Sequence, residues 1–198
     1  MNGHPIIPGS ARDSRADFGD SPKPFFSDAT RVQALRIAAA SWRLTPFRFG
    51  SRAKGKSGGI DCVGLVEELM ASAGIERFHF ERTPADNSRH VYNEKILNYL
   101  RGKIPGDPQS AILHSRFEEL APLPEKKQRT AFIHYYDPPF MPGDLLIMKT
   151  GKGLYHMPVL LGQAAFIQCA FPNGVSEGDI LAPNYQDYLV AAFRARAT

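Results

Sequence analysis

Apolar positions follow a helical spacing in the first part of the chain and a strand-like alternation in the last third. Residues 28–44 begin with Asp28, a good helix-capping residue, and carry apolar side chains three or four positions apart. This pattern predicts an amphipathic helix that ends before Thr45–Pro46, because a helical residue is disfavoured in front of proline. The predicted apolar stripe is Val32, Leu35, Ala39 and Trp42, with Ile37 at its edge.

The helical spacing is clearest in the segment GGIDCVGLVEELMASAGI, residues 58–75. We expect Asp61 to cap a helix, Cys62 to lie in its first turn and Gly74 to end it. Unpaired N–H groups and the macrodipole at a helix N-terminus favour a thiolate, so Cys62 is a candidate nucleophile. The alternative is that Cys62 is a small buried hydrophobic residue, the commonest role of such a cysteine. The expected apolar face is Leu65, Val66, Leu69, Met70 and Ala73.

Residues 76–140 form a long middle section with two further helical patterns, near residues 88–101 and 109–120. Prolines separate these predicted helices and follow them. Four histidines fall in this section without the spacing of metal ligands, so no metal site is expected. The apolar positions are Val91, Tyr92, Ile96, Leu97 and Leu100 in the first helix, and Ile112, Leu113, Phe117 and Leu120 in the second.

Short apolar runs separated by turn residues follow Met141, and they predict a series of antiparallel strands. The runs are MPGDLLIMKTG, LYHMPVLLG, AAFIQCAFPNGV, GDILAP and DYLVAAFRAR. Helices first and strands afterwards indicate an α+β fold. Residues 1–27 are rich in Pro, Gly, Ser and Asp and show no periodicity. We therefore expect an irregular N-terminal arm over residues 1–27 and a single domain over residues 28–198.

A catalytic thiolate needs a base, and the base needs an orienting group. His156 is the only histidine of the strand-rich part, and a short turn at Gly162–Gln163 separates its strand from the next one. Alternation along antiparallel strands predicts that His156 lies beside Gln168, whose carbonyl would accept an imidazole N–H and fix the tautomer. Two other interpretations are about equally open: His156 is a core histidine, and Gln168 an exposed polar residue of a strand.

The loop before the cysteine, GSRAKGKS from Gly50 to Ser57, matches the phosphate-binding pattern GxxxxGK[ST]. Its context argues against nucleotide binding, because no buried apolar strand precedes it and Gly58–Gly59 delays the helix. Asp61 would also repel a phosphate. We expect this loop to form one wall of a cleft at Cys62, with nucleotide binding as the lesser alternative.

Composition narrows the classes of protein that this chain can represent. A chain of 198 residues with 43% hydrophobic residues fits a globular domain, and a net charge of +4 suits an anionic target. Basic residues do not alternate with aromatic ones over any length, so no nucleic-acid partner is expected. Cys62 and Cys169 are the only cysteines, too few for a disulfide scaffold. No run of 18 apolar residues exists to span a membrane, and the N-terminus lacks a signal-peptide pattern.

Three stretches together resemble the NlpC-type cysteine peptidases of bacterial cell walls: DCVGLVEELMASAGI, PGDLLIMKTGKGLYHMPVLLGQAAFIQCA and the following GV. The resemblance covers roughly Ala38 to Arg196, and its ending is most similar to the branch found in phage tails and gene-transfer agents. It implies a papain-like fold with residues 76–140 as a helical insertion between the nucleophile helix and the sheet. It also implies Cys62 as nucleophile, His156 as base and then acid, and Gln168 as orienting residue, with no cofactor.

The resemblance further implies the substrate, a peptide bond in peptidoglycan stem peptides, with a γ-D-glutamyl–diamino acid bond as the usual target. Substrate-binding candidates are Phe47, Arg48, Asp61 and Val63. Val63 stands where the family usually has Ser, and Phe47 where it usually has Tyr. An amidase or acyltransferase using the same thiol is one alternative, and a non-catalytic wall-binding or phage structural module is another. We expect synthesis in the cytoplasm, with action at the wall requiring a phage-like or other route.

Overall fold

The protein is described here by a computed structural model that covers residues 25–80, 91–120, 140–150 and 154–196. Residues 1–24 of the expected arm therefore lie outside the described residues, as do His90 and His134. The helices are η1 Phe25–Ser27, α1 Ala29–Trp42, α2 Cys62–Ser72, α3 Val91–Leu100, α4 Pro108–Arg116 and α6 Pro183–Tyr188. The strands are β1 Arg52–Ala53, β2 Gly59–Ile60, β3 Phe117–Glu119, β4 Leu145–Thr150, β5 Leu154–His156, β6 Val159–Leu160, β7 Ala165–Ala170, β8 Gly174–Asp179 and β9 Leu189–Ala195.

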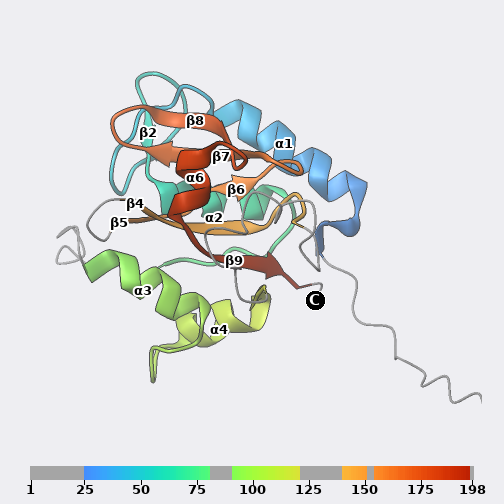
Figure 1. The fold of residues 1–198 in the computed structure, drawn as a ribbon, viewed down its shortest axis with the longest axis vertical. Coiled ribbons are helices and arrows are strands. Elements are labelled where there is room, and N and C mark those ends of the chain that lie inside the picture. The colour runs from blue at the N-terminus through green and yellow to red at the C-terminus, as the bar shows by residue number, and fades with distance from the viewer. Residues whose placement is uncertain (1–24, 81–90, 121–139, 151–153, 197–198) are drawn as a thin grey trace, which may run out of the picture.

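An antiparallel seven-stranded sheet forms the centre of the fold, in the order β3-β9-β4-β6-β7-β8, with β5 also paired to β4. Helix α2 packs against β7, and α6 contacts β4. Figure 1 shows α2 behind the sheet and α6 in front of it. The pair α3 and α4 packs at the end where β3 joins the sheet. Helices combined with an antiparallel sheet confirm the expected α+β class and agree with a papain-like fold.

Both helices predicted for the first part of the chain are confirmed, together with their caps. The Asp28 carboxylate accepts a hydrogen bond from the Thr30 amide at the start of α1. Helix α1 ends at Trp42, and the Ile37 side chain at the edge of the stripe is exposed. Helix α2 begins at Cys62 behind its Asp61 cap and ends before Gly74, which has a φ of +93°.

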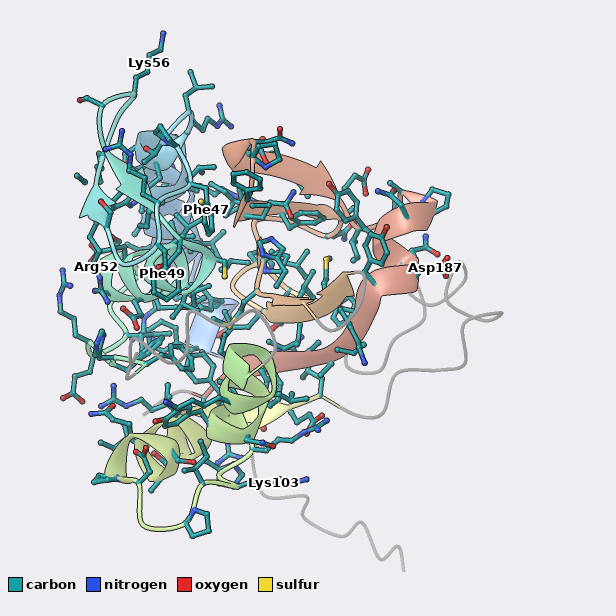
Figure 2. The ribbon with its side chains drawn as sticks, turned by 90° about the vertical axis from the view of Figure 1, so that its left-hand side faces the viewer. Phe47, Phe49, Arg52, Lys56, Lys103 and Asp187 are labelled. Atoms are coloured by element: carbon teal, nitrogen blue, oxygen red, sulfur yellow. The ribbon has the colours of Figure 1, made fainter. Side chains whose placement is uncertain are left out.

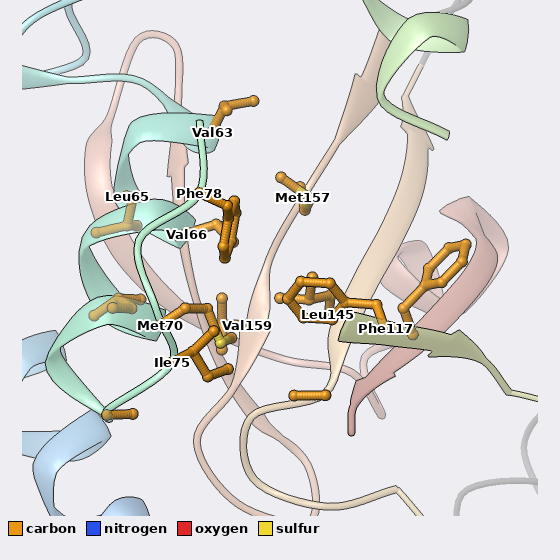
Figure 3. Packing of buried hydrophobic residues seen from close by; sticks show 14 of the residues in the cluster. Val63, Leu65, Val66, Met70, Ile75, Phe78, Phe117, Leu145, Met157 and Val159 are labelled. Carbon is orange, nitrogen blue, oxygen red and sulfur yellow. The ribbon is translucent and has the colours of Figure 1, made fainter. Parts of the chain in front are cut away.

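Apolar residues pack in two clusters on opposite faces of the sheet. Along β4 the side chains alternate, so that Leu145 and Ile147 join the cluster with α2 while Leu146 and Met148 join the other. Figure 3 shows the first cluster, in which the buried face of α2 meets side chains of the strands. The second cluster includes Phe166 and is completed by residues around α6. The sheet therefore separates α2 from α6, with apolar packing on both faces.

A buried ion pair fixes the start of β4 against β9. The Arg194 guanidinium donates to both Asp144 carboxylate oxygens, at 2.8 and 2.7 Å, and both side chains are almost fully buried. Asp144 also accepts from the Met141 amide at 2.8 Å. The Pro-Gly-Asp sequence before β4 thus sets the position from which the strand begins.

The predicted helix over residues 109–120 is wrong in its last part. Helix α4 ends at Arg116, and Phe117–Glu119 forms strand β3, which pairs with β9 in the register Phe117↔Ala195. Phe117 already has strand-like dihedral angles, and its side chain is fully buried in the core. Pairing with the sheet and burial of Phe117 therefore outweigh the local helical spacing.

Three other strand predictions need correction. The run LYHMPVLLG divides into β5 and β6 around Met157–Pro158, where proline has no N–H to donate. The run GDILAP is not a strand beyond Asp179, because Ile180 begins a turn and Pro183 begins helix α6. Strand β9 consequently starts at Leu189.

The last residues of the expected N-terminal arm belong to the packed structure. Phe25 and Phe26 form part of η1, and both side chains are buried in the core. Their rings meet edge to face with centroids 5.1 Å apart. Among the described helices, none has the length and apolar character needed to cross a membrane.

Candidate functional site

Asp61 holds the start of α2 through both oxygens of its carboxylate. Oδ1 accepts from the Gly64 amide at 2.8 Å, as expected of a helix cap, and Oδ2 accepts from the Gly50 amide at 2.7 Å. The side chain is buried, so these bonds form away from bulk solvent. Cys62 follows as the first helical residue and is partly exposed. The arrangement fixes the backbone that carries the thiol and ties it to the preceding loop.

The segment that contains Phe47 and Arg48 runs beside β2, immediately before α2. Backbone hydrogen bonds of 3.0 Å join the Arg48 amide to the Ile60 carbonyl and the Ile60 amide to the Pro46 carbonyl. The Arg48 side chain is exposed and lies over Gly59, where an added Cβ would meet its carbons at 2.4 Å. Phe47 is half-buried and packs edge to face on Phe171, with ring centroids 6.2 Å apart.

The loop that matches a phosphate-binding pattern is a hairpin rather than a strand-to-helix turn. Strands β1 and β2 pair in the register Arg52↔Ile60 and Ala53↔Gly59, and α2 starts only at Cys62. The first amide of the pattern, that of Gly50, donates to the Asp61 carboxylate. Figure 2 shows Lys56 extending outward at the hairpin tip. A phosphate-binding loop needs its amides directed to one anion at a helix N-terminus, so nucleotide binding is not supported.

A buried carboxylate that the sequence did not single out anchors this hairpin. Glu67 of α2 is only 3% exposed, pairs with Arg52 of β1 and accepts a hydrogen bond from the Phe80 amide at 2.8 Å. Arg52 also approaches Glu68 and His79. Glu67 therefore connects the hairpin, helix α2 and the segment after it. A glutamate amid the apolar face of α2 was the only signal in the sequence.

Val63, a substrate-binding candidate, lies inside the core. Its side chain is fully buried and belongs to the same cluster as Met157, the residue after His156. Figure 3 shows Val63 and Met157 at the same end of the interface between α2 and the strands. The core cluster to which both residues belong therefore joins the segments that carry Cys62 and His156.

His156 and Gln168 are in direct contact. His156 Nε2 lies 2.9 Å from Gln168 Oε1, and an amide oxygen can only accept, so Nε2 carries the proton. His156 belongs to β5 and Gln168 to β7, and no strand pairing joins these two strands directly. The contact leaves Nδ1 of the neutral imidazole as the atom with a lone pair. This tautomer suits a base whose second nitrogen is held by an orienting group.

The surroundings of His156 favour the neutral imidazole. Burial lowers the pKa of His156 from 6.5 to about 4, and the hydrogen bond to Gln168 opposes this shift without offsetting it. Part of the residue remains exposed, so protein packed around the ring accounts for the effect. At pH 7 the imidazole is therefore neutral.

Strand β7 connects the histidine to the start of α2. Cys169, which follows Gln168 in β7, is buried. The Cys169 thiol donates to the Ile60 carbonyl at 3.1 Å. Burial raises the pKa of the Cys169 thiol to about 12, and the negative charges of Cys62 and Asp61 add to the shift. A negative charge on Cys62 therefore affects the pKa of Cys169, which lies on the same strand as Gln168. Neither cysteine is in a disulfide.

Titratable side chains elsewhere in the described part of the chain do not suggest a metal centre. Within residues 25–80, 91–120, 140–150 and 154–196, no three His, Cys, Asp or Glu side chains gather as a metal site would require.

Comparison with known proteins gives a family match over most of the chain. The model of the NlpC/P60 family matches residues 44–194, a range that contains Cys62, His156 and Gln168. No curated protein matches this chain.

Two solved structures are among those that are similar to this chain. One is a protein described as similar to lipoprotein, of the NLP/P60 family, from Staphylococcus aureus, with 20% identity, a TM-score of 0.52 and coverage of 91% of this chain. The other is an NlpC/P60 family protein from Bacillus cereus, with 14% identity, a TM-score of 0.45 and coverage of 81% of this chain. This chain spans only 45% and 39% of those two chains. Because the family model accounts for most of its length, the chain belongs to the NlpC/P60 family.

Proposed function

We propose that this chain is a cysteine peptidase that hydrolyses peptide bonds in peptidoglycan stem peptides, with Cys62 as the nucleophile. Family membership supports the class of reaction. The single observation that carries the proposal for this chain is the 2.9 Å hydrogen bond from His156 Nε2 to Gln168, which leaves Nδ1 to act as the base. Cys62 contributes a thiol at the first position of a capped helix.

The reaction proceeds through an acyl-enzyme. His156 Nδ1 takes the thiol proton, Cys62 Sγ bonds to the carbonyl carbon, and the C–N bond breaks as His156 returns the proton to the amine. Backbone N–H groups at the start of α2, including that of Cys62, stabilise the oxyanion. Water, deprotonated by His156, then releases the acid and restores the thiol. Gln168 holds the imidazole in the required tautomer throughout.

The substrate side of the proposal rests on the surface next to Cys62. Arg48 is an exposed cation beside the helix start, and Phe47 with Phe171 forms an aromatic surface there. These groups suit a peptide that carries carboxylates and aliphatic carbons. We take the γ-D-glutamyl–diamino acid bond as the first candidate, with Val63 acting through packing in the core. The run AFIQCAFPNGV supports placing the chain in the phage-tail and gene-transfer-agent branch.

Digestion of defined stem peptides, analysed by mass spectrometry, tests the proposal. We expect cleavage by the wild type and none above background with Cys62→Ala. Cys169→Ala is the matched control, because it removes the other thiol and is expected to keep hydrolysis. Circular dichroism establishes that both variants are folded. Cleavage that persists in Cys62→Ala would overturn the proposed mechanism.

Adding competing amines to the same digestion separates hydrolysis from acyl transfer. A peptidase gives mainly the free acid, whereas an acyltransferase gives the new amide as its main product. Absence of any product, together with alkylation of Cys62 by iodoacetamide at pH 6 no faster than that of an ordinary thiol, would favour a non-catalytic wall-binding module.

A further inference from the structure

We propose that Phe171 is a specificity-determining residue whose exposed ring binds a sugar ring of the glycan strand that carries the stem peptide. This inference rests on the proposed function, because it assigns a further part of the same substrate to a side chain near Cys62. Three observations support it: the exposure of the Phe171 ring, the anchoring of its turn, and its place beside the candidate site.

Phe171 is the most exposed large apolar side chain in the described part of the chain, at 77%. Its ring meets the half-buried Phe47 edge to face, with centroids 6.2 Å apart. Phe49, two residues along from Phe47, is 44% exposed. Figure 2 shows Phe47 and Phe49 on the side of the molecule that carries the β1–β2 hairpin. Water around these rings would be released by a ligand that covers them, so the surface favours binding.

The turn that carries Phe171 is anchored, although the side chain itself is barely covered. The Val175 amide donates to the Thr45 carbonyl at 2.8 Å. Gly174 has a φ of +72°, and a Cβ at this position would collide with the same carbonyl oxygen. Only glycine allows the turn to approach the Thr45 segment so closely. The backbone therefore presents the Phe171 ring in a set place, which lowers the entropic cost of binding a ligand there.

The two aromatic residues belong to the segments that lead to the candidate site. Phe171 comes three residues after Gln168, at the end of β7. Phe47 pairs with Ile60, which lies two residues before Cys62. The aromatic pair therefore joins the end of the strand that carries Gln168 to the segment before the nucleophile. A ligand on Phe171 would lie beside the substrate rather than on a remote surface.

A sugar ring suits this surface better than the peptide part of the substrate does. One face of a pyranose ring carries mainly C–H groups, and the face of an aromatic ring is electronegative, so the two stack. Stem peptides offer mostly methyl groups and carboxylates, which present no comparable flat apolar face. Two amino acids and a lactoyl group separate the sugar from the γ-D-glutamyl–diamino acid bond, a span of at most about 11 Å. The sugar is thus close to a bond that lies at Cys62.

A second copy of this chain is a poorer occupant. Phe171 and Phe49 together expose at most about 300 Å² of side chain, whereas a stable interface buries about 800 Å² on each partner. Arg48, which is exposed between Phe47 and Phe49, would also bring like charges together across a two-fold axis.

Binding to inactive protein tests the inference directly. Cys62→Ala prevents cleavage, and calorimetric titration then compares a disaccharide-tetrapeptide with the same tetrapeptide lacking the disaccharide. We expect the disaccharide to raise the affinity about threefold to tenfold, as one aromatic contact would. Adding Phe171→Ala should bring this ratio close to one. Ile37→Ala, which removes an exposed apolar side chain from α1, is the matched control and should keep the ratio.

Two further substitutions separate stacking from general apolar contact, and they keep the test decisive if Phe171→Ala does not fold. Phe171→Tyr retains the aromatic face and should retain the ratio. Phe171→Leu retains apolar bulk without a flat ring and should lose it. In the active enzyme the disaccharide should lower KM and leave kcat as it is, because the sugar lies away from the reacting bond.

The outcomes separate this inference from the proposed function. A ratio that persists in both Phe171→Ala and Phe171→Leu would overturn the role of Phe171. A ratio near one with Phe171 present, or an equal loss of affinity for both ligands in Phe171→Ala, would overturn the sugar as its ligand. Each of these results leaves hydrolysis by Cys62 untouched. Lack of hydrolysis in the wild type would overturn the peptidase proposal, and the titrations would still decide whether Phe171 binds the sugar.

Discussion

The two parts of the candidate site are held by different means. Cys62 depends on backbone geometry: the Asp61 carboxylate accepts from the Gly64 amide of α2 and from the Gly50 amide of the preceding loop. His156 depends on side chains, because its ring contacts the Gln168 amide, which in turn contacts the Tyr185 hydroxyl. Strand β7 joins the two parts, since Cys169 faces α2 and Gln168 faces α6.

This difference has a physical consequence for how each part responds to change. A helix start is stabilised by many backbone hydrogen bonds and by the packing of α2, so single substitutions near Cys62 should act mainly on stability. His156 and Gln168 are held by only two side-chain hydrogen bonds, so loss of one bond removes much of what positions them. Substitutions around His156 should therefore change activity strongly while leaving the fold almost intact. Figure 2 shows the two sides, with Phe47 and Phe49 near the helix start and Asp187 of α6 across the sheet.

The largest expected effect is that of His156→Ala. Removing the base should lower kcat/KM by about 10²- to 10⁴-fold, because general acid–base catalysis contributes that much. The stability of the protein should change little. Stem-peptide hydrolysis followed by chromatography measures the effect, and His114→Ala, an exposed histidine of α4, is the control. Activity of His156→Ala within tenfold of the wild type would show that the base lies elsewhere.

The second effect concerns the Asp61 cap of helix α2. Asp61→Ala leaves two amides without their acceptor in a buried position, so we expect the free energy of unfolding to fall by about 2–3 kcal/mol. Asp28→Ala removes an exposed cap from α1 and should cost only about 0.5–1 kcal/mol. Urea unfolding of both variants measures the difference. Equal losses would contradict the view that Asp61 joins the helix to the preceding loop.

The smallest effect is the pH dependence of stability that comes from His156. Its pKa is about 4 in the folded protein and about 6.5 when unfolded, so between these values only the unfolded chain binds the extra proton. Stability should therefore fall as the pH decreases from 6.5 to 4. Because the residue is partly exposed, we expect about 1 kcal/mol, or about 2–4 °C in Tm.

Scanning calorimetry of the wild type and His156→Gln at pH 7 and pH 4.5 measures this contribution. Gln does not titrate, so the variant should lose less stability on acidification than the wild type. Parallel curves for the two proteins would mean that the histidine is not held neutral by burial.

The local features of the fold could be predicted from the sequence. Asp28, Asp61 and Gly74 each act within a few residues of their own position, and their chemistry is specific enough to locate helix ends. The antiparallel strands after Met141 followed from alternation and turn residues in the same way. The expected contact between His156 and Gln168 is present, but the strand that pairs with β7 is β6 and not β5, so the expected pairing of the two strands is not what brings these residues together.

Features that depend on distant partners could not be predicted. Phe117 leaves its helix because β9, more than seventy residues later, offers a strand to pair with. Helix α6 is short and has no side-chain cap, so only Pro183 marked its start. Val63 is fully buried in the core, and nothing in its sequence neighbours reveals the cluster that it shares with Met157. Glu67 likewise acquires its role from residues elsewhere in the chain.

The central claim is that Cys62 forms a covalent acyl-enzyme with a stem peptide. Intact-protein mass spectrometry after rapid acid quenching of the wild type with substrate, followed by peptide mapping, tests it most directly. The account predicts an added mass equal to the acyl part of the substrate, located on Cys62 and absent from Cys62→Ala. The variant Gln168→Met should impair deacylation, so the adduct should accumulate on Cys62. Product formation by this variant without the adduct, or an adduct on another residue, would contradict the claim.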